Sequence, residues 1–192
     1  MNKRIIAVLI IVFGAIFGFI SSSLADEKFS SLQCDIFTSS QVAGESRGKL
    51  YMKGDKSRIE LNTSGMDTVT IISEGNAYLY MPSQNMAMKM PVTQAKEQVP
   101  SVEDYKNNCE FMGEEQVDSE SCGVYRCFKN GQSMTMWVSN KLEFPLKIIS
   151  SGATTYYKNV NTNMPLSDGL FSLPQGVQFQ DMGSLMQGFG GN

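Results

Sequence analysis

Short runs in which hydrophobic and polar residues alternate follow one another from residue 32 to residue 160. Because successive side chains of a β-strand point to opposite faces, this period of two predicts strands rather than helices. Clusters of Gly, Asn, Asp and Ser separate the runs, as is typical of the tight turns that join antiparallel neighbours in a meander. We therefore expect strands at residues 32–40, 47–53, 57–62, 68–73, 77–81, 86–90, 110–118, 122–129, 133–138, 146–151 and 154–160.

Residues 91–108 interrupt this alternation and have a helix-forming composition. Ser101 followed by Asp104 resembles a helix start, because the hydroxyl accepts a hydrogen bond from a free backbone N–H and the carboxylate favours the positive end of the helix. We expect one or two short helices here, crossing an open face of the sheet. Residues 77–81 are apolar on both faces, which favours a curved sheet that wraps helices or closes partly into a barrel.

The N-terminus has the pattern of a secretory signal peptide. Lys3 and Arg4 precede an uncharged apolar stretch, and Ser23 and Ala25 place small side chains at the positions that signal peptidase accepts before a cut after Ala25. The apolar stretch, residues 5–20, is shorter than the roughly 20 residues that a membrane-spanning helix needs. The sequence therefore predicts export to the periplasm or beyond the cell, with no transmembrane span left after cleavage.

Three segments follow from these patterns. Residues 1–25 are the expected signal peptide, residues 26–180 the expected β domain, and residues 181–192, rich in Gly and Met and without periodicity, a flexible tail. A total of 192 residues agrees with one domain.

Composition excludes several classes of function. The chain contains no His, which excludes Ser-His-Asp and Cys-His catalysis and any metal site built on imidazole. The net charge of -3, with no long basic run, argues against nucleic-acid binding. No spacing of Asp and Glu singles out an acid–base pair. We therefore expect a binding protein rather than an enzyme, with no catalytic residue, no cofactor and no metal.

All four cysteines lie after the expected cleavage site, in an oxidising compartment, so two disulfides are expected. A four-thiolate metal site is the alternative, but such sites usually contain CxxC pairs. If residues 110–118 and 122–129 form a hairpin, Cys109 comes near Cys127. Cys122 and Cys127 would lie about 16 Å apart on opposite faces of one strand, too far to bond. This geometry predicts a Cys109–Cys127 bridge and leaves Cys34 for Cys122.

Methionines gather on the predicted strands, as in residues 86–90 and 134–136. The plainest interpretation is core filling by a flexible side chain. A second is an adaptable apolar cavity, because unbranched thioethers repack around ligands of different shape. A third is a Cu(I) site, since thioethers are soft ligands. For the cavity we expect a lining of Leu50, Met52, Ile59, Leu61, Ile71, Leu79, Met81, Met86, Met88, Met90, Met134, Met136 and Val138.

The order of several segments resembles a known family. The segments are GKLYMKGDKSRIE at 48–60, YLYMP at 78–82, QNMAM at 84–88, CGVY at 122–125, MWVS at 136–139, FPLK at 144–147 and LFSLPQG at 170–176. Together they resemble secreted bacterial proteins of unknown function that are similar to the LolA/LolB lipoprotein-carrier superfamily, including RseB-type sensor domains. The resemblance covers residues 32–178 and implies a mainly β fold, an unclosed antiparallel β half-barrel with short helices on its concave face. In the carriers a hydrophobic cavity of this fold accepts lipoprotein acyl chains.

These observations together predict a non-enzymatic periplasmic protein that binds a lipid, an acyl chain or another hydrophobic ligand in a Met-rich apolar cavity. The first alternative is an envelope protein-interaction or sensing domain whose interior is filled by its own side chains. The second is a Cu(I) binder that uses Met86, Met88 and Met90.

Overall fold

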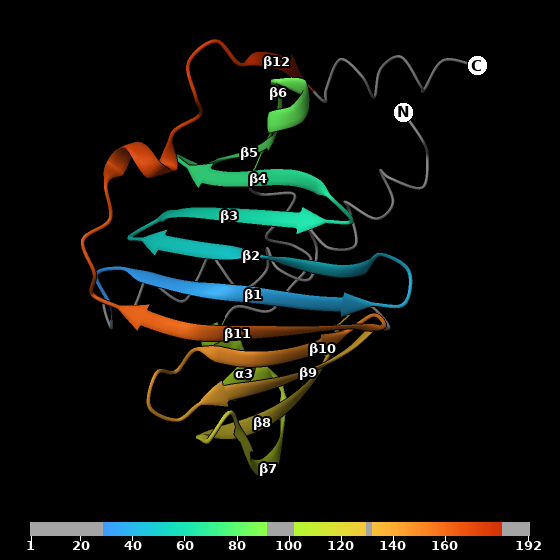
Figure 1. The fold of residues 1–192 in the computed structure, drawn as a ribbon. Helices are drawn as coiled ribbons and strands as arrows, with labels where there is room; N and C mark the ends of the chain where they lie inside the picture. The colour runs from blue at the N-terminus through green and yellow to red at the C-terminus, as the bar shows by residue number, and fades with distance from the viewer. Residues whose placement is uncertain (1–28, 92–101, 130–131, 182–192) are drawn as a thin grey trace.

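Twelve strands form one open sheet in the computed structural model, which describes residues 29–91, 102–129 and 132–181 (Figure 1). Their order across the sheet is β12-β6-β5-β4-β3-β2-β1-β11-β10-β9-β8-β7, so β12 and β7 are its two edges. All neighbouring pairs are antiparallel except β12, which runs parallel to β6. The expected mainly β fold, built on an unclosed antiparallel sheet, is confirmed.

The strand bounds agree with the hydrophobic alternation. All eleven expected strands are present, with ends within three residues of their expected positions. In the described part of the chain, β12 is the only strand that was not predicted. It is short, and its pairing with β6 cannot be recognised from a local sequence pattern. The elements are β1 (Leu32–Ser40), β2 (Gly44–Lys53), β3 (Lys56–Thr63), β4 (Met66–Ser73), β5 (Asn76–Met81), η1 (Pro82–Gln84), β6 (Met86–Pro91), α3 (Val102–Asn108), β7 (Glu110–Val117), β8 (Glu120–Lys129), β9 (Gln132–Ser139), β10 (Pro145–Ser150), β11 (Ala153–Thr162), η2 (Asp168–Phe171) and β12 (Gln178–Asp181).

Two-residue turns fix the register of several hairpins. At Glu74 and Gly75, between β4 and β5, φ is 53° and 70°, and at Asp118 and Ser119, between β7 and β8, it is 48° and 70°. Positive φ at both central residues is the geometry of turns whose twist matches that of the flanking strands. Gly75 adopts this conformation without steric cost.

The sheet has two distinct faces, which we name by their residues. The inner face is the face that carries Cys34, Leu50 and Ile59, which are cross-strand partners on β1, β2 and β3. Helix α3 packs on this face, where the ring of Tyr105 lies 4.5 Å from that of Tyr125 on β8. The expected short helix on this face is therefore confirmed at 102–108, whereas residues 92–101 lie outside the described part of the chain.

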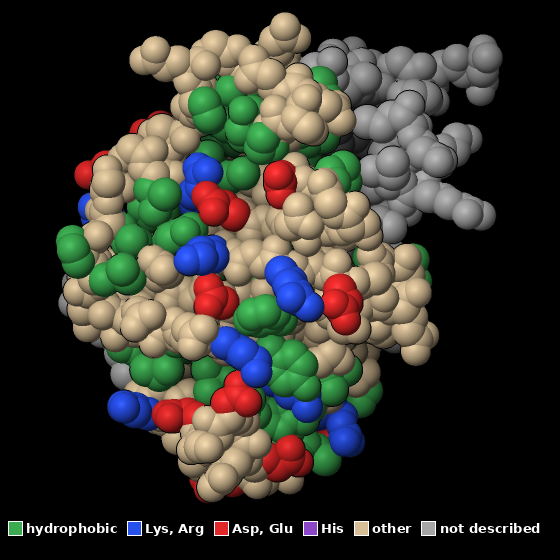
Figure 2. Space-filling model, in the orientation of Figure 1, with side chains coloured by type: hydrophobic (Ala, Val, Ile, Leu, Met, Phe, Trp, Pro, Cys, Tyr) green, Lys and Arg blue, Asp and Glu red, His purple; other side chains and the backbone are tan. Residues whose placement is uncertain are grey.

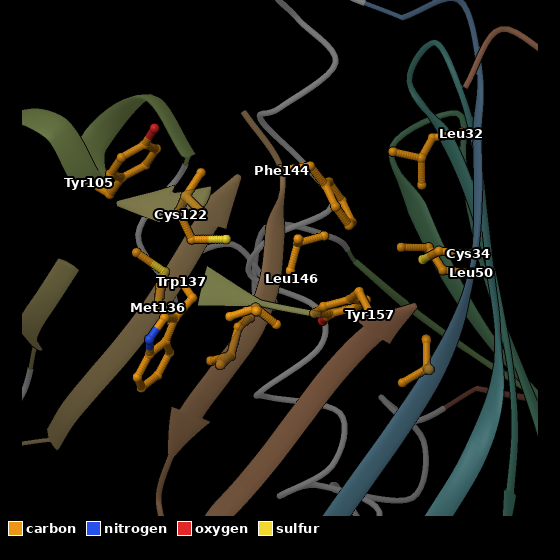
Figure 3. Close-up of a cluster of buried hydrophobic side chains, with 14 of the residues drawn as sticks. Leu32, Cys34, Leu50, Tyr105, Cys122, Met136, Trp137, Phe144, Leu146 and Tyr157 are labelled. Carbon is orange, nitrogen blue, oxygen red and sulfur yellow. The ribbon is translucent and has the colours of Figure 1, made fainter. Parts of the chain in front are cut away.

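The main core joins distant strands into one cluster, most of which lies on the inner face. Figure 3 shows Leu32, Cys34 and Leu50 on one side, Tyr105, Cys122 and Met136 on the other, and Phe144, Leu146 and Tyr157 between them. The rings of Phe144 and Tyr157 meet edge to face with their centroids 5.4 Å apart. The cluster therefore spans strands from both halves of the sheet.

One disulfide, Cys109–Cys127, joins the chain just after α3 to β8, with Cα atoms 4.5 Å apart. The hairpin and this pairing are confirmed. The expected Cys34–Cys122 pairing is wrong, because both residues are buried free cysteines. Strands β11, β10 and β9 lie between β1 and β8. Neighbouring strands lie about 4.8 Å apart. Measured across the sheet, β1 and β8 are therefore much farther apart than the Cα separation of about 7 Å or less that a disulfide allows.

Both termini extend beyond the described residues. The expected signal peptide, 1–25, lies outside them, as does the expected tail except for its first residue, Asp181, which ends β12. Within the described segments, no helix has both the length and the apolar character that crossing a membrane requires.

Candidate functional site: the inner face of the sheet

Most residues expected to line a cavity share the inner face. Cross-strand registers place twelve of the thirteen on it. They are Leu50, Met52, Ile59, Leu61, Leu79, Met81, Met86, Met88, Met90, Met134, Met136 and Val138. For Met90 this is the register position alone, opposite Ala77 on β5.

Ile71 is the exception, because it lies on the outer face opposite Arg58 and Tyr78. Both faces of β4 are buried from Thr68 to Ile72, so hydrophobicity could not distinguish its inner positions. On the outer side, η2 packs against β3 and β4, and Arg58 Nη1 donates a hydrogen bond to the Leu170 carbonyl oxygen at 3.1 Å. Because η2 covers this part of the outer face, Ile71 is buried although it does not point to the inner face.

The methionines of the inner face belong to two apolar clusters rather than one. Met52, Met134 and Met136 lie in the main core. A second cluster consists of Leu79, Met81 and Met88, with the partly buried Met86 packed against it. Between them lies Thr70 of β4, whose cross-strand partners are Ile59 of the main core and Leu79 of the second cluster.

The inner face carries no charge over most of its width. In β1–β6 and β9–β11, every Lys, Arg, Asp and Glu of the described residues has an outer-face register position. Figure 2 shows the outer face, on which positive and negative side chains are interspersed. Two of its ion pairs are Arg58–Glu60 at 2.7 Å and Lys49–Asp35 at 4.0 Å.

Three titratable groups of the main core, Cys34, Tyr105 and Tyr157, have raised pKa values and are neutral near pH 7. Burial raises the pKa of the Cys34 thiol, and the negative charge of Asp35 raises it further. Burial also raises the pKa of the Tyr157 phenol, and the nearby Cys34 raises it slightly further. The pKa of the Tyr105 phenol is raised to about 12, mainly by burial. A protonated thiol is a poor nucleophile. The inner face therefore presents neutral groups in a mostly apolar surrounding.

Buried hydroxyls on this face mostly have partners within the protein. The Thr38 and Thr155 hydroxyls are 3.0 Å apart, and those of Ser46 and Thr63 are 2.7 Å apart. Ser57 differs, because its Oγ is buried and has no hydrogen-bond partner among the described residues. Ser57 is not among the residues predicted from the sequence to line the site, although it alternates in phase with Ile59 on β3.

The described residues contain no cluster of three or more His, Cys, Asp and Glu that could hold a metal ion. The second cluster brings together three thioethers, those of Met81, Met86 and Met88.

Comparison with known sequences assigns a family without assigning a function. Residues 33–155 match DUF4412, a domain of unknown function. The uncharacterized protein MJ0687 of Methanocaldococcus jannaschii is 25% identical over 178 residues, which cover 83% of this chain and 51% of that protein. The chain thus spans about half the length of this relative.

Comparison with solved structures shows the fold. An uncharacterized conserved protein from Thermus thermophilus is similar with a TM-score of 0.65 and 15% identity, over 82% of this chain and 94% of that one. The Pseudomonas aeruginosa MucA/MucB complex matches with a TM-score of 0.50 and 12% identity, over 75% and 56%. The LolA superfamily protein NE2245 from Nitrosomonas europaea has a TM-score of 0.40 and 16% identity, over 87% and 96%. At the level of the fold, the expected resemblance to RseB-type domains is confirmed by the match to MucB.

Proposed function

We propose that this chain, which belongs to the DUF4412 family of domains of unknown function, is a non-enzymatic binding protein for a lipid or another amphiphile. The observation that supports the proposal is the largely uncharged inner face, on which two apolar clusters containing six described methionines lie side by side, with Thr70 of β4 between them. The expected signal peptide supports a location in the periplasm or outside the cell.

Burial of an acyl chain supplies the driving force. Each buried CH₂ group contributes about 0.8 kcal/mol, so a segment of about eight carbons contributes about 6 kcal/mol before the entropy and desolvation costs of association. Methionine suits such a site, because its unbranched side chain adapts to chains of different shape. The lack of charge on the described inner-face positions of β1–β6 avoids the cost of burying an ion beside the ligand.

The second cluster offers the sharper test, because Met88 is less deeply buried than Met136 of the main core. Met88→Gln introduces a polar amide of similar size on the inner face. Ile149→Gln is the matched control, since Ile149 is an exposed apolar residue on the outer face. We expect Met88→Gln to weaken the binding of a dodecanoyl lipid, measured by calorimetry, at least fivefold, and Ile149→Gln to leave it unchanged. Equal affinities in all three proteins would contradict the proposal.

A second candidate is protein interaction, favoured by apolar side chains at the sheet edge. Phe111 and Met112 of the edge strand β7 are 56% and 43% exposed. The solved structure of MucB together with MucA is an example of this fold in a protein complex. The test compares the unmodified protein with a Phe111→Ser variant. If the unmodified protein binds a protein partner that the variant does not, and neither binds lipid, protein interaction is favoured over lipid binding.

A further inference from the structure

Ser57 is the one polar member of a row of five inner-face residues that crosses β1 to β5. Cross-strand registers give the row as Leu32, Met52, Ser57, Ile72 and Ala77. All five are buried, and Ser57 is only 1% exposed. The four other members belong to the main core. A hydroxyl therefore stands in an otherwise apolar row.

The hydroxyl of Ser57 has an unused capacity for hydrogen bonding. Its Oγ has no partner within the part of the chain that the structure describes. Other buried hydroxyls of the same face, such as Ser46 with Thr63, are satisfied within the protein. Because a buried polar group without a partner is destabilising, the position favours a partner that the described residues do not supply.

The surroundings of Ser57 restrict the chemistry of that partner. Cross-strand neighbours on the same face are Met52 and Ile72, and no described side chain of β1–β6 places a charge on this face. A carboxylate or phosphate would be buried there without a counter-ion, which is strongly unfavourable. A neutral ester, hydroxyl or amide can exchange a hydrogen bond with the Ser57 hydroxyl without that cost.

We infer that Ser57 is the polar anchor of the inner face, where it hydrogen-bonds an uncharged oxygen-bearing group of the bound amphiphile. The inner face therefore selects neutral amphiphiles over anionic ones with the same acyl chain. This inference rests on the proposed binding of amphiphiles and adds the ligand class and the residue that recognises it.

The test uses three probes that share one acyl chain, each below its micellar concentration: 1-monododecanoylglycerol, dodecanoate and dodecanoyl lysophosphatidylglycerol. Calorimetry at pH 8 with the full mature chain should give the tightest binding for the monoacylglycerol. Ser57→Ala should weaken its binding about three- to tenfold, the equivalent of one hydrogen bond. Ser57→Ala should not lower the melting temperature of the unliganded protein, because it removes an unpaired hydroxyl.

Ser46→Ala is the matched control, a buried serine of the same face whose hydroxyl already has a partner. It should lower the melting temperature and leave the preference among the three probes unchanged. If all three probes bind equally, or if Ser57→Ala leaves monoacylglycerol binding unaltered, the inference is wrong while amphiphile binding stands. If none of the probes binds either protein, the proposed function itself fails.

Discussion

Cys109 is bonded to Cys127, and this bond ties the residue that follows α3 to strand β8 beneath it. Eighteen positions separate the two cysteines in the sequence. The bond therefore holds the helix against the inner face, where the rings of Tyr105 and Tyr125 also meet edge to face. Because α3 has only seven residues, it is too short to be stable alone.

The double substitution Cys109→Ala with Cys127→Ala should destabilise the protein. A bridge that closes a loop of this length contributes about 3 kcal/mol to the free energy of unfolding, so the urea midpoint should fall accordingly. Thiol titration of the unfolded, non-reduced protein should find two reactive groups, Cys34 and Cys122. A count of zero or four would contradict the disulfide pattern.

Stability should fall as the pH rises above about 8.5. Burial raises the pKa of Cys34 and Tyr157 in the folded protein, so the folded state retains protons that the unfolded state loses at alkaline pH. The stabilisation is complete below the ordinary thiol pKa of about 8.5 and is lost progressively above it. Melting temperatures between pH 7 and 10 test this.

Cys34→Ala supplies the control for the pH series. It removes the thiol, so the decline that begins near pH 8.5 should become smaller, even though the cavity lowers stability at every pH. A decline of the same size in the variant would show that the thiol of Cys34 does not cause it.

Substitutions of Thr38 and Thr155 should have non-additive effects on the free energy of unfolding, because their hydroxyls hydrogen-bond each other across β1 and β11. Thr38→Val leaves a buried hydroxyl on Thr155 without this partner and should cost about 1 to 3 kcal/mol of unfolding free energy. Adding Thr155→Val should recover part of that loss, because both polar groups are then gone. Strictly additive losses in denaturant titrations would argue against a direct bond.

Much of the fold could be predicted because its determinants are local. Alternation indicated the strands, and turn residues such as Gly75 marked the hairpins. The Cys109–Cys127 bond followed from the register of one such hairpin. The position of β1 beside β11, by contrast, depends on a pairing between distant parts of the sequence. Without that pairing, nothing in the sequence indicates that Cys34 and Cys122 lie on strands with three others between them.

The candidate site was predicted less completely for a similar reason. Inner and outer positions alternate clearly along β3, where Ser57 and Ile59 are buried and Arg58 is not. On β4 both faces are buried, so the hydrophobic pattern assigned Ile71 to the wrong face. The role of Thr70 in dividing the apolar residues into two clusters depends on its partners in β3 and β5, which only the assembled sheet reveals.

The claim that the inner face binds an amphiphile is tested most directly by mass spectrometry of organic extracts. The protein is purified from the cell envelope of the organism that naturally produces it. If the inner face binds an amphiphile, extracts should contain a neutral acyl compound in nearly equimolar amount. The Met88→Gln protein, purified in parallel, should retain clearly less of it, and the Ile149→Gln protein as much as the unmodified chain. Extracts without acyl material, from protein that also fails to bind added monoacylglycerol, would contradict the account.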